Sequence, residues 1–201
     1  KAAYQKVAFY RGLEVYTDGK YQDAYVLFKK SLTENKDAKI TARATFWKGE
    51  CEYSLDQFSE AVLTYKQFLN NTSASVTPEL KTVNYNLAYA YFKIKEYENA
   101  IPYFNTYIAQ SKEDRNRLTD AYLRMADCNY ISSKYWPAMD AYNKAIELKC
   151  VDADYAAFQK GMSYGFVNKN DKKIEDLTKF VSTYKTSQYL DDALYELGNT
   201  Y

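Results

Sequence analysis

The sequence contains no histidine, and this absence removes the usual general base and the most frequent metal ligand of protein sites. Ser-His-Asp and Cys-His arrangements and the His-Glu-x-x-His zinc motif are therefore excluded, and no glycine-rich phosphate-binding loop is present. The three cysteines include no Cys-x-x-Cys pair, and we expect them to be small buried hydrophobic residues. We predict that the chain is not an enzyme and has no catalytic residues, no metal site and no cofactor.

Neither sign of charge dominates, and long apolar runs are missing as well. There are 27 lysine and arginine residues against 26 aspartate and glutamate residues, which gives a formal net charge of +1. Strong attraction to nucleic acid is therefore not expected. Uncharged stretches such as Tyr85–Phe92 are far shorter than the roughly 18 apolar residues of a membrane span. We expect no nucleic-acid partner and no transmembrane segment in this chain.

What the chain does contain is a repeated pattern of aromatic and small residues. An alanine recurs, with steps of 37, 39 and 38 residues, at Ala24, Ala61, Ala100 and Ala138. Each has an aromatic residue three positions before it and another four positions after it. A small residue stands twelve positions before each alanine, namely Gly12, Gly49, Ala88 and Ala126. A fixed period of this length is typical of stacked two-helix units.

Within each unit, apolar residues recur at steps of three and four, which is the period of an amphipathic helix. Short polar breaks such as Asp18-Gly19-Lys20 divide each unit into two helices. The pattern predicts an all-α fold of five antiparallel helix pairs and one extra helix, in a single array over 1–201. The expected units are 5–38, 42–75, 81–114, 119–152 and 154–187, with a partial unit at 191–201. We expect the array to be a fragment of a longer repeat protein.

The small residue of the first helix, followed by Ala-x-x-x-aromatic in the second, resembles the tetratricopeptide repeat (TPR) family over the whole chain. The resemblance implies a right-handed superhelical solenoid whose concave face is lined by the first helices. In its register the helix-contact position falls on Gly49, so Gly49→Leu should cost about 1–3 kcal/mol by overpacking, whereas Lys48→Leu should cost little. In the fifth unit Lys173 takes the place of the alanine, which predicts looser or shifted packing there.

The long period and the tyrosine-rich first helices are similar to the TPR proteins of the Gram-negative cell envelope, of the Tol-Pal accessory and outer-membrane assembly lipoprotein type. Residues Phe46–Cys51 and Asp191–Gly198 carry this similarity. It implies a location in the bacterial cell envelope, in the periplasm, with the cytoplasm as the alternative.

Transferred position by position, the concave face of the family predicts an aromatic surface with charges of both signs. The expected partner-binding residues are Phe9, Tyr16, Arg43, Phe46, Glu50, Tyr53, Tyr85, Tyr89, Phe92, Arg124, Asp127, Tyr130 and Phe158. Rigid rings suit an extended peptide or a helix, because they supply contact area with little loss of entropy. The alternative is that these rings pack against neighbouring helices, since each first helix of a solenoid needs a broad apolar face.

The sequence therefore predicts a non-catalytic scaffold that binds a protein or peptide on the concave face. The family's clamp for a C-terminal carboxylate is not reproduced, because its asparagine positions hold Leu13 and Glu50. A glycan- or peptidoglycan-binding envelope module, with tyrosines stacking on sugar rings, is the first alternative. An RNA-binding helical repeat is the second, and the near-neutral charge argues against it.

Overall fold

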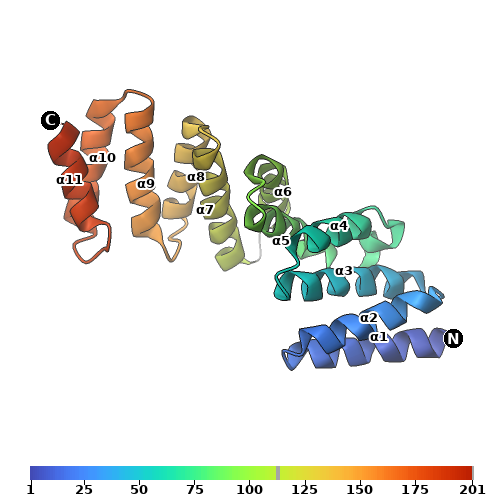
Figure 1. The fold of residues 1–201 in the computed structure, drawn as a ribbon. Helices are drawn as coiled ribbons and strands as arrows, with labels where there is room; N and C mark the ends of the chain where they lie inside the picture. Colours follow the sequence, from blue (N-terminus) through green and yellow to red (C-terminus); the bar gives the residue numbers. More distant parts are fainter. Residues whose placement is uncertain (112–113, 201) are drawn as a thin grey trace. The chain divides into compact units, whose positions relative to one another are not determined.

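The computed structural model describes residues 1–111 and 114–200. Over these residues the chain forms eleven α-helices and one short 3-10 helix, with no strand (Figure 1). The helices are α1 (Ala2–Thr17), α2 (Tyr21–Glu34), α3 (Ala38–Ser54), α4 (Phe58–Leu69), η1 (Thr72–Val76), α5 (Leu80–Lys93), α6 (Tyr97–Gln110), α7 (Arg115–Ile131), α8 (Tyr135–Glu147), α9 (Ala153–Phe166), α10 (Asn170–Thr183) and α11 (Leu190–Thr200). The predicted all-α fold of five helix pairs and one extra helix is confirmed.

The chain divides into two compact units, Lys1–Tyr103 and Phe104–Tyr201, which we call unit 1 and unit 2. In unit 1, α1 packs on α2, α2 on α3, α3 on α4 and α4 on α5. In unit 2, α7 packs on α8, α8 on α9, α9 on α10 and α10 on α11. The single array over 1–201 concerns the two units together and stays a prediction.

Five three-residue turns of one shape join the two helices of each pair. The middle residue of each turn has a left-handed φ, between 56° and 76°; these residues are Gly19, Asp56, Lys95, Ser133 and Asn168. In the first turn, the N–H of Gly19 donates to the carbonyl of Tyr16 (2.9 Å) and the N–H of Lys20 to that of Val15 (3.2 Å). The other four turns repeat both hydrogen bonds. This is the Schellman motif, which satisfies carbonyls at the helix end and reverses the chain. The turns lie within one residue of the predicted breaks.

The repeated small residue of the first helix lies against the repeated large residue of the second. A Cβ atom built on Gly12 would lie 2.7 Å from the Phe28 ring, and one on Gly49 would lie 2.9 Å from the Tyr65 ring. Both rings are buried. Each contact joins residues sixteen positions apart. The repeat register predicted from the sequence therefore brings the small residue of the first helix against the aromatic residue of the second.

Gly49→Leu is therefore expected to destabilise unit 1. The new side chain would displace the buried Tyr65 ring, and overpacking of this kind costs about 1–3 kcal/mol. The matched control is Gly198→Leu in α11, because a Cβ on Gly198 meets nothing within 4 Å. We expect the thermal unfolding midpoint to fall for Gly49→Leu alone. Equal midpoints for the two variants would contradict the packing described here.

In the fifth pair, where Lys173 predicted looser or shifted packing, the structure shows how the lysine is accommodated. The lysine is buried, and its aliphatic stem lies on Gly165, where an added Cβ would be 3.2 Å from the Lys173 Cδ. Its ammonium group pairs with the Glu196 carboxylate of α11 at 2.6 Å. The long side chain is accommodated because the facing position is glycine and because its charge reaches a partner on the next helix.

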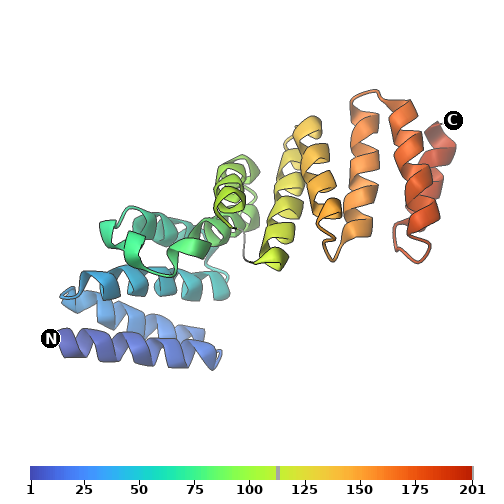
Figure 2. The same cartoon turned by 180° about the vertical axis from the view of Figure 1, so that it is seen from behind.

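The connection between α4 and α5 is more ordered than its polar sequence suggested, because it contains η1 (green, Figure 2). The Asn71 side chain opens this short helix by accepting a hydrogen bond from the Ser73 N–H at 2.9 Å. The helix η1 contacts α3, and the chain that follows it places Glu79 against two α3 side chains. Arg43 Nε lies 2.8 Å and Trp47 Nε1 3.0 Å from Glu79 Oε1.

Candidate functional site

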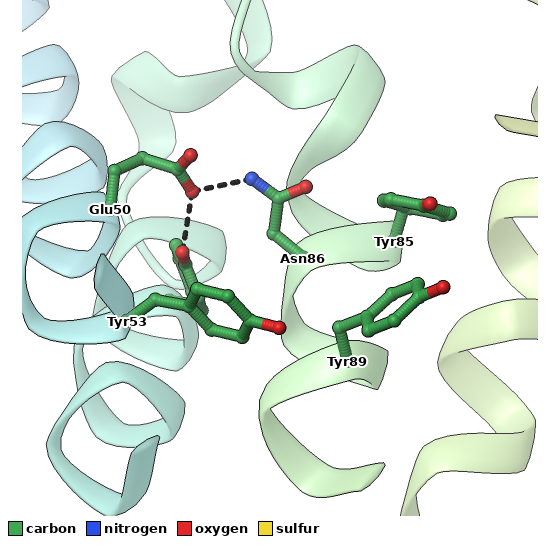
Figure 3. Close-up of a pocket in the computed structure, with 6 residues that line it drawn as sticks. Glu50, Tyr53, Tyr85, Asn86 and Tyr89 are labelled. Carbon is green, nitrogen blue, oxygen red and sulfur yellow. Dashed lines mark hydrogen bonds between the residues drawn. The ribbon is translucent and has the colours of Figure 1, made fainter. Parts of the chain in front are cut away.

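Unit 1 contains a pocket of about 230 Å³ that side chains of α3, α4 and α5 line (Figure 3). The lining residues are Glu50, Tyr53, Tyr65, Tyr85, Asn86 and Tyr89. Four of them, Glu50, Tyr53, Tyr85 and Tyr89, belong to the predicted partner-binding set. The structure therefore brings these four together at one place.

Helical spacing explains why these residues share one pocket. Glu50 and Tyr53 are three residues apart on α3, and Tyr85 and Tyr89 are four residues apart on α5, so each pair occupies one face of its helix. Figure 3 shows the three labelled tyrosine side chains and the Glu50–Asn86 pair around the same opening. The pocket thus depends on the packing of two first helices and on Tyr65 from the intervening α4.

Glu50 is the polar centre of the pocket. Its Oε1 accepts hydrogen bonds from the Tyr65 hydroxyl and from the Asn86 Nδ2 (Figure 3). Burial of Tyr65, together with the adjacent Glu50 charge, raises the pKa of the Tyr65 hydroxyl well above its usual value. Tyr65 therefore stays protonated at neutral pH and acts as a permanent donor to Glu50.

The tyrosine rings form the apolar part of the wall. The Tyr85 and Tyr89 rings are tilted by 54° with centroids 4.9 Å apart, and the Tyr53 ring packs edge-on against Phe58 with a centroid distance of 5.1 Å. Tyr53, Tyr85 and Tyr89 are all half-buried. They combine fixed positions with exposed ring surface, which is the combination that peptide-binding aromatic residues need.

Asp127 occupies the position in α7 that corresponds to Glu50 in α3, but it is enclosed. Its Oδ1 accepts hydrogen bonds from the hydroxyls of Tyr142 (2.8 Å) and Tyr155 (3.0 Å), and its Oδ2 from Arg124 Nη1 (2.8 Å). Burial raises the pKa of the Asp127 carboxyl, and these three donors oppose the effect. The predicted residues Arg124 and Asp127 thus form an internal network in unit 2.

Three predicted residues are core residues. Phe9 contributes to a buried cluster with Phe28, Phe46 contacts the Tyr65 ring, and Phe158 contacts Phe180. All three rings are buried. Their burial favours the packing alternative for these positions.

Arg43 lies between core and surface. It pairs with the buried Glu79, and its guanidinium lies 4.9 Å from the centroid of the Phe9 ring. The positive charge is therefore held within unit 1 by a salt bridge and a cation–π contact.

The remaining predicted aromatic residues are half-buried members of ring clusters. Tyr16 contacts Trp47, and burial raises the pKa of its hydroxyl to about 12. Phe92, near the end of α5, contacts Tyr97, the first residue of α6. Tyr130 contacts Phe166 in unit 2. These residues lie outside the pocket lining.

Sequence reasoning missed two residues of the pocket, Tyr65 and Asn86. Tyr65 stands at the repeated aromatic position of the second helix, which was not part of the predicted partner-binding set. Asn86 is not aromatic and was not part of the predicted partner-binding set. The signal that could have found both is the carboxylate of Glu50 among the predicted aromatic residues, because a partly buried carboxylate requires donors nearby.

The cysteine side chains are buried, as predicted, and free. Burial raises the pKa of the Cys51 and Cys128 thiols to about 12, which disfavours the reactive thiolate. Over residues 1–111 and 114–200, no cluster of three or more cysteine, aspartate or glutamate residues could hold a metal ion. None of the helices in the same residues is long and apolar enough to cross a membrane.

Comparison with known proteins supports the repeat assignment. The family model described as "Tetratricopeptide repeat" matches residues 82–114. This segment is therefore similar to a TPR. The match covers most of α5 and all of α6, and α5 supplies Tyr85, Asn86 and Tyr89 to the pocket. No curated protein sequence matches the chain.

Solved structures show that the TPR fold extends over nearly the whole chain. MamA 41-end from Desulfovibrio magneticus RS-1 aligns with a TM-score of 0.70 and 17% identity, over 92% of this chain and 97% of that chain. YrrB, described as a TPR protein with an unusual peptide-binding site, aligns with a TM-score of 0.76 and 16% identity, over 94% and 90%. A tetratricopeptide repeat protein from Parabacteroides merdae ATCC 43184 gives 0.72 and 15%, over 98% and 73%. At these identities the likeness shows the fold alone.

Proposed function

We propose that this chain is a non-catalytic interaction scaffold that binds a peptide of a partner protein at the unit 1 pocket. The observation that carries the proposal is the group of half-buried tyrosines, Tyr53, Tyr85 and Tyr89, around a carboxylate in an open pocket. Rings of this kind dominate the energy of many interfaces, because they bury large areas and lose few rotamers. The peptide-binding site named for YrrB supports a peptide as the ligand on this fold.

The first helices supply most of the pocket, which matches the face that the TPR resemblance predicts for ligands. Glu50 and Tyr53 come from α3, and Tyr85, Asn86 and Tyr89 come from α5. The formal net charge of +1 gives no support for a nucleic-acid ligand. A glycan that stacks on the rings is the competing ligand, and the experiment below distinguishes glycan binding from peptide binding.

The test is a peptide-library selection against the whole folded chain, with binding of the selected peptides measured by calorimetry. Tyr89→Ala is expected to lower the affinity for the selected peptides by about 30-fold, which corresponds to a hot-spot residue worth about 2 kcal/mol. Tyr4→Ala is the matched control, because Tyr4 lies on α1 and its side chain is exposed. Circular dichroism must show that both variants remain folded.

The proposal would be contradicted if no selected peptide needed Tyr89 for binding. Binding of chitooligosaccharides or peptidoglycan fragments with the same dependence on Tyr89 would replace the peptide by a glycan. The envelope location, with the cytoplasm as the alternative, remains a prediction from the resemblance, and the argument for the pocket does not depend on it.

A further inference from the structure

Two polar contacts connect α3 to the segment that forms α5, and they share one register. Arg43 Nε donates to Glu79 Oε1 at 2.8 Å, and Asn86 Nδ2 donates to Glu50 Oε1. Each contact joins residues 36 positions apart, and the second contact lies seven residues further along both segments. Glu79, the N-cap residue of α5, is itself helical (φ −63°, ψ −22°). Since seven residues make two helical turns, both contacts lie on the same helix faces, about 10 Å apart along the axes.

Glu79 is the buried acceptor of the first contact. Its side chain is only 5% exposed, and its Oε1 also accepts a hydrogen bond from Trp47 Nε1 at 3.0 Å. Its Oε2 is buried and has no hydrogen-bond donor among the residues that the structure describes. Within those residues the carboxylate is therefore held by Arg43 and Trp47, and both of these donors belong to α3.

The unit 1 pocket follows the second contact along the same two helices. Glu50 and Asn86 line it, and three residues beyond them Tyr53 of α3 and Tyr89 of α5 line it as well. Figure 3 shows these side chains beside one opening, with α3 on one side and α5 on the other. The separation of α3 and α5 therefore sets the distance between the tyrosine rings that face the ligand.

We infer that Glu79 is a positioning residue for peptide binding. It holds the start of α5 on α3 and thereby sets the shape of the pocket two helical turns away. The inference rests on the proposed peptide scaffold and names a residue outside the pocket lining that controls its affinity. When such a support is removed, affinity falls because binding must then also order the pocket wall.

The first repeat contains a similar ion pair that serves as a control. Lys6 lies six residues before Gly12, as Arg43 lies six residues before Gly49, and Lys6 pairs with Asp37 at 3.3 Å. This pair is exposed, by 53% for the lysine side chain and 30% for the aspartate. It does not line the unit 1 pocket. Lys6→Met therefore removes an ion pair from the corresponding position without acting on the pocket.

The first arm of the test needs no ligand. The double variant Arg43→Met, Glu79→Leu replaces the whole buried pair by apolar residues, a change that is often neutral or stabilising. The Asn86 side-chain amide signal of the ¹⁵N-labelled full chain is compared with that of the wild type, and Asn86→Ala assigns it. We expect the signal to move towards the position of a solvent-exposed asparagine amide in the double variant and to stay in place in Lys6→Met.

The second arm measures affinity by calorimetry, with a peptide that was selected on the wild-type chain and needs Tyr89. We expect the double variant to bind this peptide about tenfold more weakly. Glu79→Gln keeps an oxygen that can accept hydrogen bonds from Arg43 and Trp47, and it should bind the peptide within about threefold of the wild type.

A destabilised variant of unit 2 separates positioning from a general loss of stability. In Gly161→Leu the new side chain would displace Leu177, because a Cβ on Gly161 would lie 2.8 Å from the Leu177 Cδ2. We expect this variant to unfold at a lower temperature than the wild type, yet to bind the peptide with unchanged affinity while it is folded. If the double variant does not fold, Trp47→Phe removes one of the two donors to Glu79 and should shift the same Asn86 signal.

Each outcome bears on one of the two proposals. An Asn86 signal that stays in place in the folded double variant would overturn the inference. A moved signal with unchanged peptide affinity would overturn it as well, because Glu79 would then act on the helices without acting on binding. A moved signal in a chain for which no Tyr89-dependent peptide is selected would support control of the pocket by Glu79 and contradict the peptide scaffold.

Discussion

Replacing Lys48 by methionine is expected to destabilise the chain by about 3–5 kcal/mol, the usual effect of removing one partner of a buried ion pair. The Lys48 ammonium group lies 2.5 Å from Glu52 Oε1 and 2.9 Å from Thr64 Oγ1. The Glu52 side chain is only 3% exposed, against 20% for Lys48. Without the lysine, a carboxylate would remain in the core of unit 1 with no counter-charge in contact with it.

The double variant Lys48→Met, Glu52→Leu separates loss of the charge partner from loss of packing. Because replacing a whole buried pair by apolar residues is often neutral or stabilising, we expect it to recover most of the lost stability. Lys30→Met on the exposed face of α2 is the control and should change stability by less than about 0.5 kcal/mol. Urea denaturation measures all four proteins. A Lys48→Met midpoint equal to that of Lys30→Met would mean that the pair contributes nothing.

Asp127→Ala is expected to destabilise unit 2 by about 1–3 kcal/mol, the usual cost of leaving a buried hydrogen-bonding group without its partner. The aspartate accepts hydrogen bonds from three donors, and its removal would take this acceptor from the buried Tyr142 hydroxyl. Arg124 would keep its ion pairs with Asp120 and Asp152. Asp127→Asn keeps acceptor capacity and should have a smaller effect. Thermal and urea unfolding of the full chain provide the measurement.

The exposed Asp140 of α8 supplies the control, and Asp140→Ala should leave the midpoint unchanged. If the hydrogen bond to Tyr142 matters, Asp127→Ala should cost less in a Tyr142→Phe background than in the wild type, because the stranded hydroxyl is then absent. Purely additive effects would show that the two side chains act independently. Peptide binding at the unit 1 pocket should be unchanged in every folded Asp127 variant.

Local patterns explain why the sequence predicted so much of the fold. The helix period, the polar breaks and the spacing between Gly49 and Tyr65 each involve residues close together in the chain. A repeat also presents every local rule several times, so one irregular unit does not change the assignment. Local patterns do not explain how Lys173 is accommodated, because the residues that it contacts, Gly165 and Glu196, come from two other helices.

The candidate site was predicted less completely, because burial depends on the neighbours that other repeats supply. Phe46 and Tyr85 both belong to the predicted partner-binding set, yet Phe46 packs against Tyr65 and Phe68 while Tyr85 borders an open pocket. The charged residues show the same limit. Arg43 pairs with Glu79, 36 residues away. The sequence also gave no sign that Lys48 serves a buried partner, and the ion pair reverses the expectation that its replacement would cost little.

The five Schellman turns leave the chain with sites for variation. Their middle residues are all exposed, and four of them are not glycine although the backbone there is left-handed. Main-chain hydrogen bonds define the bend, so a glycine, aspartate, lysine, serine or asparagine gives the same shape. Substitutions at these exposed middle residues are expected to keep the main-chain hydrogen bonds, whereas an insertion would change their spacing. The turns at Ser133 and Asn168, both in unit 2, are places to attach a reporter away from the residues that line the unit 1 pocket.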